Sequence, residues 1–204
     1  MEKILSFTKK NRILLSRVLI GCVVLLMIFS RSVWQPGLAV HIASELLAFV
    51  LVLFAAFGRL WALSYISGHK TRDLITEGPY SIMRNPLYFF SLSGALGVCI
   101  LSKSILVSGS ILLAFAFYYP LVIRAEEEHL AKVHGESFRH YCSVVPSFFP
   151  KLSLFHEPKD YPVNARLFRR TFFSVMWFPL AFILIHFLGH LQEMGIVPVL
   201  VFIP

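Results

Sequence analysis

Long apolar segments alternate with short polar segments along most of the 204-residue chain. An α-helix needs about 20 mostly apolar residues to cross the hydrocarbon layer of a membrane. The pattern predicts five such helices, at Ile13–Ser30, Leu38–Phe57, Leu87–Leu101, Ile105–Ile123 and Phe172–Leu191. Only three residues separate the third from the fourth, so we expect these two to form a tight helical hairpin.

The composition supports a membrane protein. Hydrophobic residues make up 57% of the chain and charged residues only 15%, whereas about a quarter of the residues in a soluble domain are charged. We therefore expect an all-α integral membrane protein in which residues 1–204 form a single domain. Residues 171–204 would be an additional C-terminal span. The first apolar segment is expected to remain as a helix, because no small-residue cleavage site follows it.

The positions of the basic residues predict the orientation. Most Lys and Arg residues lie before Ile13, between 58 and 86, or between 124 and 170. Five spans would place all three segments on one side, and the positive-inside rule makes that side the cytoplasm. We expect a multi-pass protein of a bacterial inner membrane. The net charge is +8. Because the basic residues cluster at the ends of the apolar segments, membrane orientation explains this charge and no nucleic-acid partner is expected.

The start of the third predicted helix is unusually polar and stiff. Pro86 suits the first position of a helix, and Asn85 before it suits the N-cap. The positive end of the helix dipole attracts anions there, and Arg84 adds a planar set of donors that matches a carboxylate. The simpler alternative is an ordinary helix cap with Arg84 reaching the lipid headgroups.

A second polar cluster, "RAEEEHLAKVHGESFRHY" at 124–141, follows the fourth predicted helix. Counting 1.5 Å per residue from the hairpin turn predicts that Arg84–Tyr88 and Arg124–Glu127 lie at the same membrane face. Tyr80, Tyr118 and Tyr119 would be nearby. A ligand with a carboxylate, a sulfonium cation and an adenine ring would suit this mixture. The alternative is that the glutamates form a solvated surface.

The segments "GPYSIMRNPLY" and "RAEEEHLAKVHGESFRHYCSVVP" resemble the isoprenylcysteine carboxyl methyltransferase family and its bacterial relatives. The resemblance covers roughly residues 58–150, which would be the catalytic core. Asn85 stands where the family often has histidine, and Phe138 replaces the first tyrosine of a Y-x-x-Y motif. The matching residues are Gly78, Pro79, Tyr80, Arg84, Pro86, Tyr88, Glu126, Glu127, Leu130, Gly135 and Tyr141.

The resemblance implies an enzyme that uses S-adenosylmethionine in a pocket at the cytoplasmic face and needs no metal. Arg124 and Glu127 are the expected catalytic residues. The expected cofactor-binding residues are Tyr80, Arg84, Asn85, Pro86, Tyr88, Glu126, Glu127, His129 and Tyr141. The acceptor would be lipophilic or lipid-linked, most like the carboxylate of an isoprenylated cysteine. A phospholipid amine or a small thiol are alternatives. Membrane lipid is an expected partner, and no obligate protein partner is expected.

Two other classes of function stay open: a non-catalytic scaffold with this fold, and a carrier with a His/Glu relay. His186 and His190 are four residues apart and share one helix face, which suits either a metal pair without an evident third ligand or an interfacial position. Glu45 lies inside an apolar helix, where a charge is costly. It should therefore find a partner, for example a histidine of the last predicted helix.

Overall fold

The structure, a computed structural model, describes residues 21, 25, 28–33, 37–67 and 73–203. Nearly all regular secondary structure of the described part is helical, which confirms the all-α prediction. The predicted first helix, Ile13–Ser30, lies largely outside the described residues. The elements are β1 (Ser30–Ser32), α2 (Leu38–Ile66), α3 (Pro79–Ile82), α4 (Pro86–Ser102), α5 (Ile105–Val144), η1 (Leu152–Leu154), α6 (Ala165–Val175), α7 (Trp177–Glu193) and β2 (Val201–Ile203).

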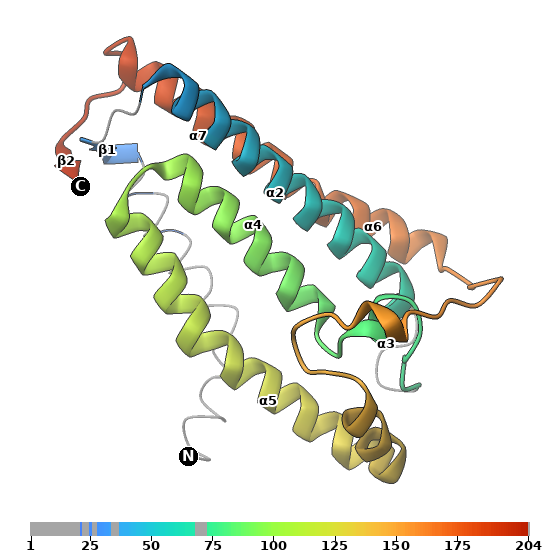
Figure 1. Cartoon of the computed structure of the whole chain (residues 1–204). Helices are drawn as coiled ribbons and strands as arrows, with labels where there is room; N and C mark the ends of the chain where they lie inside the picture. Colours follow the sequence, from blue (N-terminus) through green and yellow to red (C-terminus); the bar gives the residue numbers. More distant parts are fainter. Residues whose placement is uncertain (1–20, 22–24, 26–27, 34–36, 68–72, 204) are drawn as a thin grey trace.

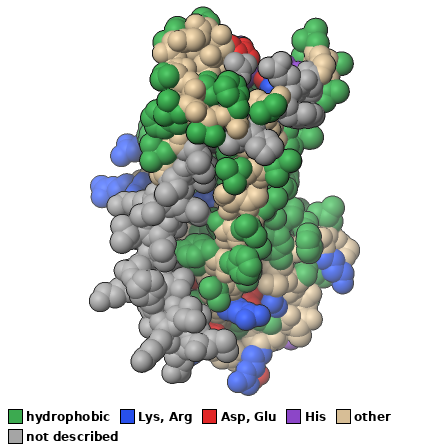
Figure 2. All heavy atoms as spheres, turned by 90° about the vertical axis from the view of Figure 1, so that its left-hand side faces the viewer, with side chains coloured by type: hydrophobic (Ala, Val, Ile, Leu, Met, Phe, Trp, Pro, Cys, Tyr) green, Lys and Arg blue, Asp and Glu red, His purple; other side chains and the backbone are tan. Residues whose placement is uncertain are grey.

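The long helices run lengthwise beside one another, with α4 and α5 joined as a hairpin and α2 next to α6 and α7 (Figure 1). We call the end that carries α3 the α3 end, and the end with the turn at Ser102–Ser104 the hairpin end. Of the described helices, α2, α5 and the Ala165–Glu193 unit are long and apolar enough to cross a membrane, and α4 is a shorter apolar helix. Hydrophobic side chains form a broad outer surface (Figure 2), as lipid contact requires.

Small residues bring α2 and α4 into close contact. Gly94 and Gly97 of α4 face α2, where Ala48, Val52 and Ala55 are almost completely buried. Apolar side chains gain little by leaving lipid for a protein neighbour, so membrane helices associate largely through close van der Waals packing of small residues. This contact fixes the position of the α4 start relative to α2.

Helix α5 is much longer than the sequence pattern predicted. It continues beyond Ile123 to Val144, because residues 124–134 are mostly good helix formers. The acidic cluster therefore lies on the helix itself. At Gly135 the backbone leaves the helical conformation, with φ 53° and ψ −120°, a region that only glycine adopts readily. Phe138 and Tyr141 beyond it pack with Val145 in a buried cluster.

A short pair of strands closes the hairpin end. β1 pairs in parallel with β2, with Ser30 opposite Val201. The Ser32 hydroxyl donates to the backbone oxygen of Lys103 in the hairpin turn, at 2.5 Å. These bonds tie the segment before α2 and the C-terminal segment to the same end of the bundle.

Replacement of Gly97 by alanine should destabilise the protein. The new Cβ would lie 2.8 Å from the Ala48 carbonyl oxygen, so α2 and α4 must separate, at a cost of about 1–3 kcal/mol. Gly109→Ala is the matched control, since nothing lies within 4 Å of its Cβ position. The control should be neutral or slightly stabilising because alanine favours helix. Unfolding in detergent measures both, and equal stabilities would contradict the packing argument.

Candidate functional site

The segment that follows α5 folds over α3. The backbone N–H of Lys151 donates to the Ile82 carbonyl at 2.9 Å, and that of Gly78 donates to the His156 carbonyl at 3.0 Å. We call residues 145–158 the strap. The strap holds the start of α4 and the end of α5 together, although these points, Pro86 and Val144, are 58 residues apart in the chain.

Glu127 accepts three hydrogen bonds on a single carboxylate oxygen, Oε1. The donors are Arg84 Nε at 3.1 Å, Asn85 Nδ2 at 3.0 Å and Ser147 Oγ at 3.2 Å. We call these four residues the clasp. The side chains of Arg84 and Glu127 are only 15% and 24% exposed. The two polar clusters that the hairpin length predicted to share one face are therefore in direct contact.

The start of α4 differs from the prediction in one respect. Pro86 is the first residue of α4 and Asn85 occupies the N-cap position, but the Asn85 side chain makes no capping hydrogen bond. Instead, its backbone oxygen accepts from the N–H groups of Tyr88 and Phe89, both at 3.2 Å. The Asn85 amide nitrogen donates to the charged Glu127 oxygen, and a carboxylate is a stronger acceptor than a neutral group.

The donors of Arg84 are largely used within the protein. Besides the bond to Glu127, Nη1 donates to the backbone oxygens of Cys142 and Val145, at 3.0 and 3.4 Å. Oε2 of Glu127, in contrast, accepts no hydrogen bond from any described residue. Nη2 of Arg84 likewise forms no hydrogen bond with a described residue. The clasp thus offers a ligand both an acidic and a basic group, and binding of a ligand carboxylate by Arg84 and Asn85 stays a prediction.

Tyr80 and Tyr141 join α3 to the end of α5. The Tyr141 hydroxyl donates to the Tyr80 backbone oxygen at 2.7 Å. Burial raises the pKa of the Tyr80 hydroxyl, and the neighbouring Tyr141 and Glu126 raise this pKa further. Tyr80 is therefore a neutral hydroxyl at physiological pH. Phe138, which replaces a tyrosine of the family motif, is 4% exposed and packs beside Tyr141.

Aromatic rings surround the base of the hairpin. Tyr88 of α4 meets Tyr119 of α5 edge to face with centroids 5.3 Å apart, and Tyr119 stacks on Phe115 at 4.0 Å. Phe148 of the strap lies 5.8 Å from Phe89 by ring centroids. These rings lie between α4, α5 and the strap, and we call them the aromatic wall.

Arg59 of α2 is a site residue that the sequence analysis missed. Its Nη1 donates to the Leu87 backbone oxygen at 3.2 Å and to the Ser91 hydroxyl, and its guanidinium lies 5.3 Å from the Phe178 ring centroid. Nε is buried without a hydrogen-bond partner, and no described Asp or Glu forms an ion pair with Arg59. The only signal in the sequence is a lone arginine near the end of an apolar segment.

Arg59 lies close to three tyrosines of the predicted site region. Tyr119, Tyr88 and Tyr80 are all near enough to interact with it electrostatically. Arg59 is half-buried, and a partly desolvated cation without an acidic neighbour is unfavourable. An anionic ligand group would relieve that cost.

The structure does not join every predicted residue to the clasp. Arg124, Glu126 and His129 are exposed on α5. Neither Arg124 nor His129 forms a described hydrogen bond or ion pair with Arg84, Asn85 or Glu127. Their roles in binding or catalysis stay predictions.

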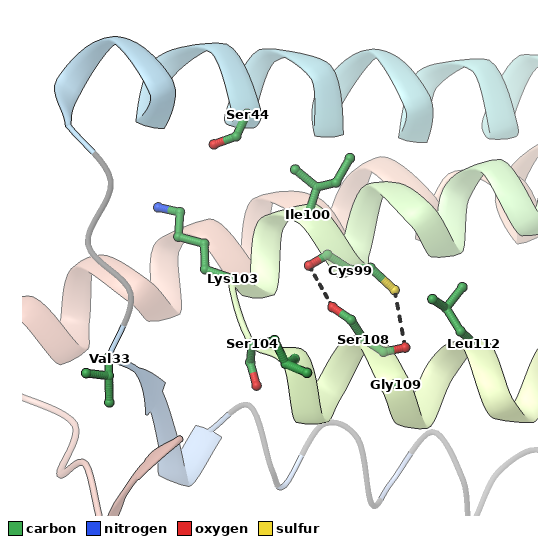
Figure 3. Close-up of a pocket in the computed structure, with 10 residues that line it drawn as sticks. Val33, Ser44, Cys99, Ile100, Lys103, Ser104, Ser108, Gly109 and Leu112 are labelled. Carbon is green, nitrogen blue, oxygen red and sulfur yellow. Dashed lines mark hydrogen bonds between the residues drawn. The ribbon is translucent and has the colours of Figure 1, made fainter. Parts of the chain in front are cut away.

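A groove of about 1000 Å³ opens at the hairpin end, away from the clasp. Its lining includes Cys99, Ile100, Ser108 and Leu112, with Lys103 at one side (Figure 3). The Ser108 hydroxyl donates to the Cys99 backbone oxygen at 3.2 Å. The lining is mainly apolar and lacks acidic groups among the described residues, so this groove does not match the pocket predicted for the cofactor.

Glu45 lies near the same end and has the partner that its position predicted. Its Oε1 is 3.2 Å from His41 Nε2, 3.7 Å from Lys103 Nζ and 3.7 Å from His186 Nδ1. The predicted contact between Glu45 and a histidine of the last helix is confirmed. These contacts connect α2, the hairpin turn and α7.

A comparison with known protein families matches the part of the chain that carries Arg84, Asn85 and Glu127 of the clasp. A family model described as phospholipid methyltransferase matches residues 46–137. The nickel-cobalt-cadmium resistance protein NccN of Alcaligenes xylosoxydans xylosoxydans is 38% identical over 175 residues, which cover 85% of this chain and 80% of that protein. The cobalt-zinc-cadmium resistance protein CzcN of Cupriavidus metallidurans is 38% identical over 173 residues, covering 85% and 79%. No solved structure matches.

Replacement of Glu127 by glutamine should destabilise the protein even without a ligand. The change removes the charge that three donors share, and hydrogen bonds to a charged group each contribute about 1.5–3 kcal/mol. Glu136→Gln, on the same helix, is the control, because the Glu136–Arg139 ion pair is highly exposed and should contribute little. Equal unfolding free energies for the two variants would show that the clasp is not a stabilising contact.

Proposed function

We propose that this chain, which belongs to the phospholipid methyltransferase family of membrane proteins, transfers a methyl group from S-adenosylmethionine to a lipophilic acceptor. The reaction would occur at the α3 end of the bundle. We assign this end to the cytoplasm, because Arg59, Arg84 and the basic residues of the 124–170 segment lie toward it and the positive-inside rule applies.

The observation that carries the proposal is the pairing of two unlike sites within one small region. The clasp presents an acidic group in Oε2 of Glu127, and Arg59 presents a half-buried cation between α2 and α4. Both sites adjoin the start of α4, since Arg59 donates to the Leu87 backbone oxygen and Glu127 accepts from the Asn85 amide. An acidic and a basic site side by side suit a reaction between a cationic donor and an anionic acceptor.

The residues at the α3 end fit S-adenosylmethionine. Glu127 and the exposed Glu126 can bind its ammonium group or its ribose hydroxyls, and the aromatic wall can contact its adenine. Glu126 is also close enough to Tyr80 to interact with it electrostatically. When bound, the sulfonium supplies an already activated methyl group, so neither a metal nor a strong base is needed for a carboxylate acceptor.

The contribution of the protein is then alignment and exclusion of water. In-line methyl transfer requires that the acceptor oxygen lie directly behind the methyl carbon. The clasp and the strap together can hold the donor in place, while the aromatic wall keeps water from the reacting atoms. Arg59, held by Leu87 and Ser91 of α4, can orient the anionic group of the acceptor.

The acceptor can reach this site from the lipid. The outer surface of the helices is hydrophobic, and Arg59 sits on a membrane-spanning helix rather than in a polar loop. Isoprenylcysteine carboxylate is the acceptor most like that of the resembled family. A phospholipid amine, whose phosphate would provide the anionic group, and a small thiol are the alternatives.

The names of NccN and CzcN describe resistance to nickel, cobalt, zinc and cadmium. We propose the same cellular setting for this chain, with methylation of a membrane component as its contribution. The carrier alternative is favoured only by the His41–Glu45–His186 contacts, and it predicts ion flux that does not depend on S-adenosylmethionine.

Purified protein incubated with methyl-labelled S-adenosylmethionine and a membrane lipid extract should transfer label to a lipid fraction. Base treatment releases label as methanol from a methyl ester but not from a methylated amine, so the same sample identifies the acceptor atom. Glu127→Gln should weaken cofactor binding measured by calorimetry, whereas Glu136→Gln should not. Absence of both cofactor binding and transfer would favour the scaffold or the carrier.

Replacement of Arg59 by glutamine should impair use of the acceptor but not binding of the cofactor. Loss of one charged hydrogen bond of about 1.5–3 kcal/mol corresponds to roughly a 10- to 100-fold lower kcat/KM for the acceptor. The cofactor Kd should stay unchanged, because Arg59 makes no described contact with the clasp. A weaker cofactor Kd with normal acceptor kinetics would place Arg59 on the donor side instead.

A further inference from the structure

We propose that His186 and His190 form a binding site for a divalent transition-metal ion such as Zn²⁺ at the hairpin end of α7. This site is separate from the clasp and is not part of the proposed methyl transfer. It rests on the placement of all four ring nitrogens of the two histidines.

The two Nε2 atoms face each other. They lie 3.3 Å apart, and the ring planes are nearly perpendicular, at 85°. Two nitrogens bound to one tetrahedral metal ion at about 2.05 Å also lie roughly 3.3 Å apart. The spacing is therefore already that of a metal-bound pair, without any change of side-chain position.

The opposite nitrogen of each ring lies near a carboxylate. His186 Nδ1 is 3.7 Å from Glu45 Oε1, and His190 Nδ1 is 3.4 Å from Glu193 Oε2. A carboxylate on one side of an imidazole favours the proton on that nitrogen and leaves the other free to bind metal. The His190–Glu193 contact is the closer of the two, whereas the 3.7 Å contact of His186 with Glu45 is electrostatic and too long for a hydrogen bond. Both Nε2 lone pairs then point into the same space, where they repel each other unless a cation or a proton lies between them.

The surroundings favour a cation that exchanges with solvent. His186 and His190 are 39% and 55% exposed, and His190 lies in the last turn of α7, where the helix dipole is negative. No third His, Cys, Asp or Glu of the described chain completes the set, so water fills the other positions. Imidazole nitrogen suits Zn²⁺, Ni²⁺ and Co²⁺ rather than Ca²⁺ or Mg²⁺.

The test is titration of the full-length protein in detergent with Zn²⁺, followed by calorimetry. The affinity tag must not contain histidine. The wild type should bind one saturable equivalent at this site, and His190→Ala should lose it. Described contacts of the His190 side chain reach only His186 and Glu193 of its own helix, so this variant should keep its fold. His140→Ala is the control, since His140 is exposed on α5.

Glu193→Gln gives a second, independent readout. Loss of a carboxylate behind a metal-binding histidine typically weakens binding by about 10- to 100-fold, so an intermediate affinity is expected. Zn²⁺ should also raise the Tm of the wild type and not that of His190→Ala. Equal Zn²⁺ affinity in the wild type and His190→Ala would overturn the proposal, as would the absence of saturable binding in the wild type, which would mean that a proton joins the rings.

Discussion

The carboxylate of Glu127 on α5 binds two other parts of the chain, the start of α4 and the strap. Its Oε1 accepts from Arg84 and Asn85 at the start of α4 and from Ser147 of the strap. Each of these groups would be costly to bury alone, because an unpaired charge or amide in a poorly hydrated region loses its bonds to water. Bound to one another, they fix the geometry of the α3 end, and the proposed cofactor site depends on that geometry.

Other packing contacts fix the positions of these groups relative to one another. The close contact of Gly94 and Gly97 with α2 sets where α4 begins relative to Arg59. At Gly135 the helix changes direction. Phe138 and Tyr141 then pack in a buried cluster, and the Tyr141 hydroxyl bonds to Tyr80 of α3. The strap then closes over α3 through backbone hydrogen bonds. Nε of Arg59 is buried without a hydrogen-bond partner, which is unfavourable for stability, and this is the reason for proposing Arg59 as a residue of the acceptor site.

The two ends of the bundle carry different chemistry. The α3 end combines acidic, basic and aromatic groups suited to a small charged molecule and a lipophilic acceptor. The hairpin end carries Lys103, Glu45 and the histidines of α2 and α7, together with an apolar groove. Helices of membrane-spanning length separate the two sets, so the proposed methyl transfer and the proposed metal site are physically independent and can be tested separately.

The sequence alone determined the features that depend on local pattern and on length. Apolar segments predicted the helices, Pro86 predicted where α4 begins, and the short turn with two arms of similar length predicted that Arg84 and Glu127 share one face. Helical rise is constant, so such counting is reliable over a single hairpin. Glu45 likewise predicted a partner, because an unpaired charge in an apolar helix is unfavourable.

Only the tertiary structure decided which groups bind each other. The Asn85 side chain binds Glu127 rather than capping its own helix, and Arg84 donates to Glu127 and to the end of α5. Arg59 donates to α4 and lies against the Phe178 ring of α7. The opposed nitrogens of His186 and His190, each backed by a carboxylate, were also not readable from their spacing. Such choices depend on competition between donors and acceptors that meet only after packing, and no local pattern in the sequence encodes that competition.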